Sequence, residues 1–563
     1  MSTLPPLANL FCFWDEDPAL RRAVHSVLLG SYPHEQVFAE REWVGVQIDL
    51  PALTPTPLLP KGFRFAEGAD VAVPQLEEPF DAKKVTTMDG DFGFVHLGER
   101  GCAVCVRSCG GLVPFFHEVR PGRTAISTSL DLMAKFRPEE PEADEFVYAI
   151  WSTGFGAFPW HRSFLKGVSA LAPAHLVGVT EGKAEVSCYW DPRPHKLEKP
   201  SRVHLYECGE QLRTLLIANL ERDLHPTGLN LLTLSGGIDS SSLAHLARNV
   251  AGVRVASLSL IPPGEGPDLD LALSFLDPQV ESLGICPSWK YPLGFKERKE
   301  YLTRAPHHVI PVIHPALCVL PETNRESKVD VVFGGEVADS ICGAPLTLPD
   351  WVRAVSPFKL ITWLPRLPFG ERDALKWLKW RVAWMRGHPV LPYPEALPPF
   401  FDESLKGEYR HWRRDQEISL KADRRPKSYL GLDLSQDVWL AMNWETTSAL
   451  GIRRSTPFVS RAMIQLGYAA HPEEQFMLGT KSVIKAGLKD DVPPIYLWRN
   501  DKGTWGRPSI AAAKGGAALR QVLQREVREV SAAMIEAAGR GLTSVREDRL
   551  KGWRFAVEAR TIR

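Results

Sequence analysis

The stretch that most constrains the fold is "LLTLSGGIDSSSLAHL", residues 231–246, which joins an apolar run to a helix-like run through two adjacent glycines. A short apolar run bounded by glycines is typical of a strand that is buried on both faces. Two more strand-like runs follow, "VRVASLSLI" at 253–261 and "VDVVFGG" at 329–335. Strands that alternate with helices predict a parallel sheet covered on both faces, and ligands of such sheets bind at the carboxyl ends of the strands.

The two glycines predict a loop that binds phosphate. Without side chains at Gly236 and Gly237, the backbone can present N–H groups to an anion, and the N-terminus of the following helix adds partial positive charge. Asp239 would repel bare phosphate, so its carboxylate is predicted to bind Mg²⁺. The predicted nucleotide-binding residues of this loop are Leu234, Ser235, Gly236, Gly237, Asp239, Ser240 and Ser241. An ordinary capped helix is the alternative, although a cap does not require two glycines and three consecutive serines.

Residues 1–190 carry a different pattern, in which short runs alternate between apolar and polar residues. Runs such as "DFGFVHL", "RTAISTSL" and "AHLVGVT" are separated by Gly and Asp turns, which predicts stacked antiparallel sheets. A polar connector that contains prolines, residues 191–204, predicts a domain boundary. The expected fold is therefore α+β followed by α/β: an antiparallel β-sheet sandwich flanked by helices, then a domain with a parallel sheet and helical additions.

Composition restricts the class of protein and its compartment. The 563 residues include 67 Lys plus Arg and 67 Asp plus Glu, so the net charge does not suggest nucleic acid as a partner. No secretory signal and no apolar run of membrane-spanning length is seen, and the cysteines are scattered, which favours a reduced, cytoplasmic location. Cys102, Cys105 and Cys109 are close enough in sequence to bind a metal, but no second ligand pair accompanies them, which favours small core residues.

The loop at 235–241 resembles the SGGxDS loop of the ATP pyrophosphatase family, whose members cleave ATP between the α and β phosphates. A second loop, "FGGEVADSICG" at 333–343, resembles the SGEGxDE loop of the asparagine synthetases. Three later segments resemble further motifs of that family in the same order: "ALGIRRSTPFVSR", "LGTKSVIKAGL" and "LWRNDKGTWG". In the first half, "MDGDFGFVHL", "RSCGGLVPFF" and "TAISTSLDLMAK" resemble its glutaminase-like domain.

The resemblance implies roles for the polar residues of these segments. Asp339 would be the second carboxylate that binds Mg²⁺, beside Asp239. Glu336 falls where the family has a catalytic glutamate, which would take the proton from the incoming ammonium. Lys502 matches the catalytic lysine, which would stabilise the oxyanion of the tetrahedral intermediate. A solvated turn and a surface lysine are the alternatives for these positions.

The resemblance also implies a division of the chain. The expected parts are an inactive glutaminase-like domain at 1–190, a linker at 191–204, an ATP pyrophosphatase (synthetase) domain at 205–515 that includes a Trp- and Arg-rich helical region at 345–440, and a charged helical tail at 516–563. The implied cofactors are ATP and Mg²⁺, and Ser257 and Gly335 join the nucleotide-binding residues. The adenine of ATP would lie near the strands "LTLS" and "VASLSL".

The start of the chain departs from the family pattern. A glutaminase of this class needs Cys directly after the initiator Met, because the free α-amine is the base for the thiol. Residue 2 is Ser, and Cys12 is internal, so the first domain is expected not to hydrolyse glutamine unless the chain is cleaved before Cys12. The amine for the reaction would then come from outside the chain.

A ligase of this family without its own ammonia source is similar to lasso peptide cyclases and β-lactam synthetases, which adenylate a carboxylate and let an amine of the same molecule attack it. Trp377, Trp380 and Trp384 predict one face of a helix, which either packs in the core or binds a peptide or a partner protein. A helix that lies on a membrane surface is a further alternative. The second interpretation favours macrolactam or isopeptide formation in a precursor peptide, with a precursor-binding protein and a protease as partners. Amidation of a small acid by free ammonia and β-lactam ring closure are the alternatives. A non-catalytic scaffold is a further alternative, which the intact loop carboxylates and Lys502 argue against.

Overall fold

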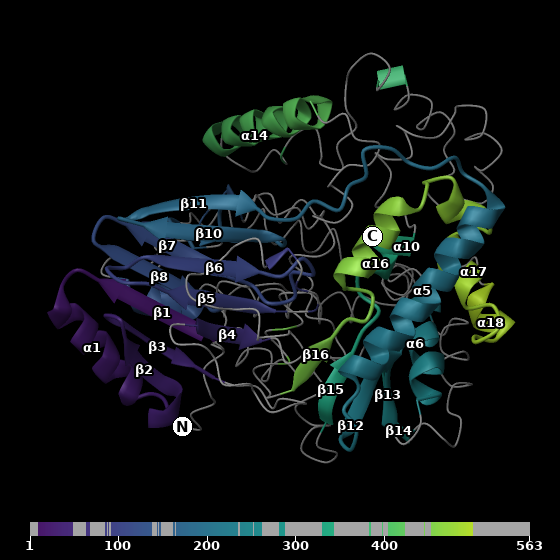
Figure 1. Ribbon diagram of the computed structural model, residues 1–563, viewed down its shortest axis with the longest axis horizontal. Coiled ribbons are helices and arrows are strands. Elements are labelled where there is room, and N and C mark those ends of the chain that lie inside the picture. The colour runs from purple at the N-terminus through teal and green to yellow at the C-terminus, as the bar shows by residue number, and fades with distance from the viewer. Residues whose placement is uncertain are drawn as a thin grey trace, which may run out of the picture.

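The computed structural model describes residues 10–48, 63–67, 85–137, 144–147, 161–234, 237–250, 253–261, 281–287, 329–342, 382–383, 397, 403–422, 444, 447 and 452–498, apart from the single positions 87, 89, 91, 145 and 164. These residues form two antiparallel sheets and one parallel sheet (Figure 1). The antiparallel sheets precede the parallel sheet in the chain, so the predicted class, antiparallel sheets followed by an α/β part, is confirmed.

The first antiparallel sheet has the strand order β2-β3-β1-β8-β7-β9. Its strands are β1 (Leu10–Asp15), β2 (Val37–Glu40), β3 (Trp43–Gln47), β7 (Phe116–Arg120), β8 (Arg123–Ser127) and β9 (Ser169–Ala170). Helices α1 (Pro18–Leu29) and α3 (Leu130–Lys135) cover one face, where Phe11 and Phe13 of β1 share a core with Leu28 of α1. Strand β1 pairs with β3 on one side and β8 on the other.

The second antiparallel sheet packs against the other face of β1. Its order is β11-β10-β6-β5-β4, with β4 (Phe63–Glu67), β5 (Gly93–Leu97), β6 (Ala103–Arg107), β10 (His175–Thr180) and β11 (Lys183–Cys188). Leu10 and Cys12 of β1 share a core cluster with Val95 and Cys105, so the two sheets face each other as a sandwich. Because both faces of β1 are covered, its sequence "LFCFWD" is apolar almost throughout.

The cysteine cluster between residues 102 and 109 belongs to this sandwich. Cys105 and Cys109 are buried and Cys102 is partly exposed. The burial of Cys105 and Cys109 agrees with the interpretation that they are small core residues.

The parallel sheet has the order β14-β13-β12-β15-β16, and all of its pairs are parallel. Its strands are β12 (Leu229–Leu234), β13 (Arg254–Ile261), β14 (Glu281–Pro287), β15 (Val329–Phe333) and β16 (Arg453–Ser455). The first strand in sequence, β12, lies in the middle, with β13 and β14 on one side and β15 and β16 on the other. The point between β12 and β15 is therefore a topological switch point, where ligands of such sheets bind.

Helix α5 connects the sandwich to the parallel sheet. The helices of this half are α5 (Arg202–Asp223), α6 (Ile238–Arg248), α10 (Ala338–Cys342), α16 (Arg461–Ala469), α17 (Ser482–Gly487) and α18 (Pro494–Leu497). Helix α5 begins inside the predicted connector 191–204, because the Ser201 side chain accepts the backbone N–H of His204 and caps the helix. Two glycines meet where α5 contacts α17: a Cβ on Gly209 would lie 2.6 Å from the backbone N of Gly487.

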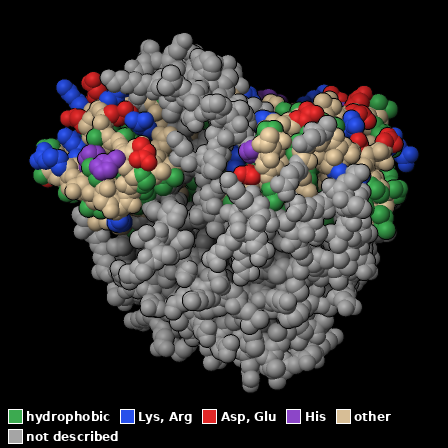
Figure 2. Space-filling model, turned by 90° about the horizontal axis from the view of Figure 1, so that it is seen from below, with side chains coloured by type: hydrophobic (Ala, Val, Ile, Leu, Met, Phe, Trp, Pro, Cys, Tyr) green, Lys and Arg blue, Asp and Glu red, His purple; other side chains and the backbone are tan. Residues whose placement is uncertain are grey.

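Helix α14 (Glu403–Ala422) is the helix that the structure describes in the predicted Trp- and Arg-rich region, whereas Trp377, Trp380 and Trp384 lie outside the described residues. The Trp412 ring lies 6.2 Å from the ring of Phe146, so α14 contacts the chain that precedes the connector. On the face drawn in Figure 2, acidic and basic side chains of the described residues are intermixed. No described helix is long and apolar enough to cross a bilayer.

Substituting Gly209 with Ala should destabilise the protein by about 1–3 kcal/mol, because the added methyl group must displace the α17 backbone. Gly407 on α14 is the matched control, since a Cβ there would meet nothing within 4 Å. Gly407→Ala should be neutral or stabilise by about 0.5–1 kcal/mol through helix propensity. Thermal and urea unfolding of both variants measure the effect, and equal stability of the two would contradict the close α5–α17 contact.

Candidate active site

The two predicted loops meet at the switch point of the parallel sheet. Strands β12 and β15 pair in parallel, and Thr233 Oγ1 donates to the carbonyl of Phe333 at 3.0 Å. Just beyond the strands, a Cβ on Gly335 would lie 2.9 Å from the Cβ of Asp239. Only a residue without a side chain allows this approach without displacement, so Gly335 places the loop of Glu336 directly against the first turn of α6.

Gly237 is the N-cap residue of α6, and no side chain among the described residues caps its first turn, whereas α5 and α16 are capped by Ser201 and Ser460. Asp239 lies within the helix, and the Ser240 hydroxyl donates to the Gly237 carbonyl at 3.3 Å. The N-cap position is thus held by a glycine, and a helix N-terminus with free backbone N–H groups is a general anion-binding element.

Asp239 forms an ion pair with Lys481, the residue before α17. The two side chains are largely buried, with exposed fractions of 19% and 6%. Lys481 has φ +59° and ψ +41°, a left-handed conformation that a non-glycine residue adopts at a cost. The sequence analysis does not include Lys481 among the predicted site residues. The signal that could have identified it is its place in the segment "LGTKSVIKAGL", which resembles a motif of the family.

Glu336 forms an ion pair with Arg454 of β16, whose side chain is only 1% exposed. Val337, which follows Glu336, has φ +69° and is the one β-branched residue among the described positions with positive φ. The C-terminal end of α5 fixes the segment of Arg454, since the Ser455 hydroxyl donates to Asp223 at 2.6 Å. Arg454 is a second site residue that the sequence analysis does not predict, although it lies in the motif "GIRRSTPF".

The remaining predicted residues are placed less completely. Leu234 ends β12, Ser241 is buried in the first turn of α6, and Ser257 on β13 stands opposite Leu232 in the strand register. Asp339 is the second residue of α10, which begins three residues after Gly335, but its side chain is outside the described residues. Ser235, Gly236 and Lys502 also lie outside them.

Cys12 is placed where it cannot act as a nucleophile. It lies in the middle of β1, paired with Gly45 and Ile126 on the two neighbouring strands, and its side chain is fully buried. Burial raises the pKa of the Cys12 thiol well above its ordinary value, so the thiol stays protonated.

Comparison with known proteins places the synthetase-like half of the chain. Residues 212–538 match the asparagine synthase family, and this range is more than half of the 563 residues. No curated protein matches the chain.

Two solved structures are weakly similar. The NMN synthetase of Francisella tularensis is 18% identical with a TM-score of 0.18, over 25% of this chain and 58% of that chain. The U34-tRNA thiolase NcsA of Methanococcus maripaludis, solved with its 4Fe-4S cluster, is 18% identical with a TM-score of 0.18, over 41% of this chain and 82% of that chain. At this TM-score, neither likeness bears on the fold or the function.

Lys485 lies on α17, one turn after Lys481, and its burial can be tested through the pH dependence of stability. Burial and the neighbouring charge of Lys481 lower its pKa from 10.5 to about 8. Between these two values the unfolded chain binds a proton that the folded protein does not, so the penalty that the charged Lys485 imposes on folding decreases as pH rises through this window. Lys485→Met should therefore stabilise the protein below pH 8, and its advantage over wild type should shrink toward pH 10.5.

Thermal unfolding of wild type and Lys485→Met at several pH values between 7 and 10 measures this difference. Lys489→Met is the matched control for the loss of a lysine from this segment, because the Lys489 side chain is exposed. A pH-independent difference for Lys485→Met would show that Lys485 titrates as an ordinary lysine.

Proposed function

We propose that this chain, which belongs to the asparagine synthase family of ATP-dependent ligases, activates a substrate carboxylate with ATP and joins it to an amine. Pyrophosphate leaves in the first step and AMP in the second. The observation that carries the proposal is the meeting of the loops after β12 and β15. It brings Asp239 and Glu336 to the ligand-binding edge of the sheet, each beside a buried cation.

The described residues fit a nucleoside triphosphate with its magnesium ion. Asp239 offers carboxylate oxygens, which Mg²⁺ prefers, and Lys481 adds a buried positive charge. Within the described part of the chain, no side chain caps the first turn of α6, and the buried Ser241 hydroxyl has no hydrogen-bond partner. Asp239 would hold Mg²⁺ together with Asp339, and the bound ion neutralises charge on the leaving pyrophosphate.

Lys481 changes partner in this proposal. Before the nucleotide binds, its ion pair with Asp239 compensates two buried charges that would be costly alone. When Asp239 holds Mg²⁺, the ammonium group of Lys481 turns to the phosphate oxygens at the N-terminus of α6. A lysine suits this exchange because its charge is compact and its stem is flexible.

Glu336 and Lys502 act in the second step of the proposed reaction. A carboxylate does not accept an amine until one of its oxygens can leave, and the bond to AMP makes this possible. Glu336, held in place by Arg454, takes the proton from the incoming ammonium, since only a neutral amine is nucleophilic. Lys502 stabilises the oxyanion of the tetrahedral intermediate, which collapses to the amide as the bond to AMP breaks.

The amine is proposed to come from outside the chain, because the buried Cys12 thiol does not supply a glutaminase nucleophile. We favour a peptide substrate whose own amine closes a macrolactam or isopeptide ring, with a precursor-binding protein and a protease as partners. A small acid, amidated by free ammonia or closed to a β-lactam, is the alternative substrate.

The products of ATP turnover test the proposed reaction. Purified protein with MgATP should yield AMP and pyrophosphate when an acceptable acid and amine are present. Peptides with internal Asp and Glu form one arm of the test, and free amino acids with ammonium salts form the other. A peptide product that is lighter by one water supports the ring closure, and an amidated small acid supports the alternative. Formation of ADP and phosphate would refute both.

Variants of the charged residues should separate nucleotide binding from amide formation. Asp239→Asn and Lys481→Met should each weaken binding of Mg²⁺ with α,β-methylene-ATP by roughly ten- to a hundredfold, the effect of losing a charged hydrogen bond. Lys502→Ala should leave this binding unchanged and abolish amide formation. Titration calorimetry measures the affinities, with the exposed Lys489→Met as control. Normal binding by Lys481→Met would contradict the proposed exchange of partners.

A further inference from the structure

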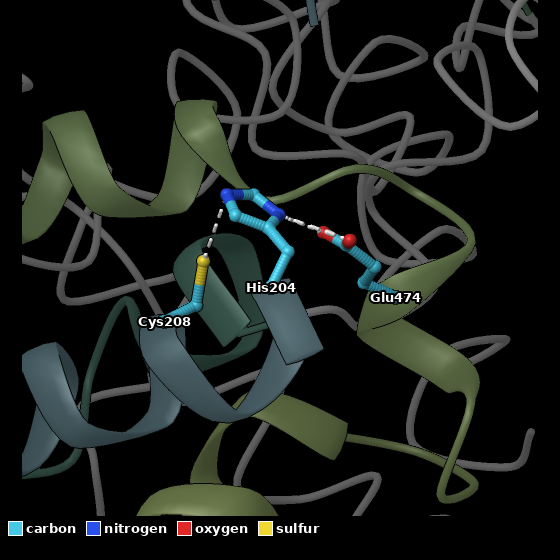
Figure 3. Close-up of side chains that lie close together, drawn as sticks. All are labelled: His204, Cys208 and Glu474. Carbon is cyan, nitrogen blue, oxygen red and sulfur yellow. Dashed lines mark hydrogen bonds and ion pairs between the residues drawn. The ribbon is translucent and has the colours of Figure 1, made fainter. Parts of the chain in front are cut away.

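A second group of metal-binding side chains lies at the start of α5, on residues to which the proposed reaction gives no role. His204 and Cys208 are one turn apart on α5, so they share one face of the helix. Glu474 of the short helix η6 (Glu474–Phe476) faces His204 from 270 residues further along the chain. One ligand atom from each of the three lies within 4.8 Å of the others (Figure 3).

Glu474 fixes the orientation of the His204 ring and the position of its proton. One oxygen of its fully buried carboxylate lies 2.8 Å from His204 Nδ1. The same carboxylate accepts the backbone N–H groups of Ser201 and His471, both at 2.9 Å. A buried carboxylate in this position requires a donor on the ring, so Nδ1 carries a hydrogen, and in the neutral form of this tautomer the lone pair is on Nε2.

The Nε2 lone pair faces two more ligand groups. Cys208 Sγ is hydrogen-bonded to Nε2 at 3.7 Å, and a carboxylate oxygen of Glu198, in the connector before α5, lies 3.8 Å from Nε2. A lone pair and a carboxylate repel each other unless a proton or a metal cation lies between them. Either cation would have to sit at Nε2, between the helix and the connector.

The spacing of these atoms fits a metal ion. Zinc binds nitrogen and oxygen at about 2.0–2.2 Å and thiolate sulfur at about 2.3 Å, so its tetrahedral ligands are roughly 3.4–3.6 Å apart. The separations of 3.7 and 3.8 Å around Nε2 are near this value, and the second is too long for a direct hydrogen bond to Glu198. A histidine that binds metal through one nitrogen commonly donates the other N–H to a carboxylate, as His204 does to Glu474.

We propose that Cys208, His204 and Glu198 bind one borderline divalent transition-metal ion, for which Zn²⁺ is the best match, with Glu474 as the outer hydrogen-bond acceptor. Mixed nitrogen, thiolate and carboxylate ligands suit zinc, whereas Mg²⁺ prefers oxygen alone. Cys208 loses its proton to become a ligand. Because Cys208 is only 3% exposed, the ion has a structural role: it attaches the connector and the turn at Glu474 to α5.

Cobalt is the probe for this site because it replaces zinc and reports thiolate ligands by colour. The full-length protein, freed of metal with a chelator and kept reduced, is titrated with Co²⁺ and followed by absorption. We expect about one equivalent to bind tightly, with a thiolate-to-cobalt charge-transfer band in the near ultraviolet and intense visible bands typical of tetrahedral geometry. Zn²⁺ should then displace the cobalt, and elemental analysis should find one zinc per chain.

Variants assign the ligands. Cys208→Ser should abolish the charge-transfer band, whereas Cys188→Ser, at an exposed cysteine of β11, should retain it. Glu198→Gln alters an exposed side chain outside the core, so it should weaken cobalt binding at least tenfold without loss of folding, checked by circular dichroism. A wild-type protein that is folded but gives no charge-transfer band, or a band that survives Cys208→Ser, would overturn the proposal and leave a proton on His204 as the bridging cation. None of these measurements depends on ATP turnover.

Discussion

The parallel pairing of β12 with β15 is the constraint on which the candidate active site depends. It brings together the ends of two strands that are 100 residues apart in the chain, Thr233 and Phe333. Side chains would keep the loops that follow apart, but Gly335 allows its backbone to lie against the Cβ of Asp239. The two acidic residues of the site, Asp239 and Glu336, therefore come from adjacent loops at one edge of the sheet.

The charges of this edge make it dependent on segments late in the chain. Buried carboxylates are costly unless they are paired, and both partners here, Arg454 and Lys481, come from beyond residue 450. Without the edge strand β16 and the segment before α17, the loops after β12 and β15 would present two largely buried acids without these counterions. The ion pairs are thus part of the folding of the site as well as of its proposed chemistry, and they keep its acidic groups compensated when no nucleotide is bound.

The features that were predictable from the sequence are those that depend on neighbouring residues. Apolar runs before glycines marked β12 and β15, and alternation marked β5, β8 and β10. Strand β14 was not predicted, since "ESLGICP" has neither a continuous apolar run nor regular alternation. The ion pair of Lys481 with Asp239 spans 242 residues, and no local pattern carries such a distance. The contact of Glu474 with His204 spans 270 residues and is likewise absent from any local pattern. The spacing of His204 and Cys208 on one helix face can be read from the sequence, but it does not indicate a site without Glu474.

Helix α5 explains how the late segments reach their places. Its first turn bonds to Glu474 through His204, its middle packs on α17 at Gly209, and its last turn accepts the hydroxyl of Ser455 through Asp223. Arg454 precedes Ser455, and Lys481 precedes α17, so one helix fixes the position of both cations of the site. Helix α5 also continues the connector from the sandwich. A displacement of its N-terminal end would therefore move the whole helix, and with it Arg454 and Lys481, the counterions of Glu336 and Asp239. This is a physical reason for the antiparallel sandwich to matter to the site, independent of any chemistry in the sandwich itself.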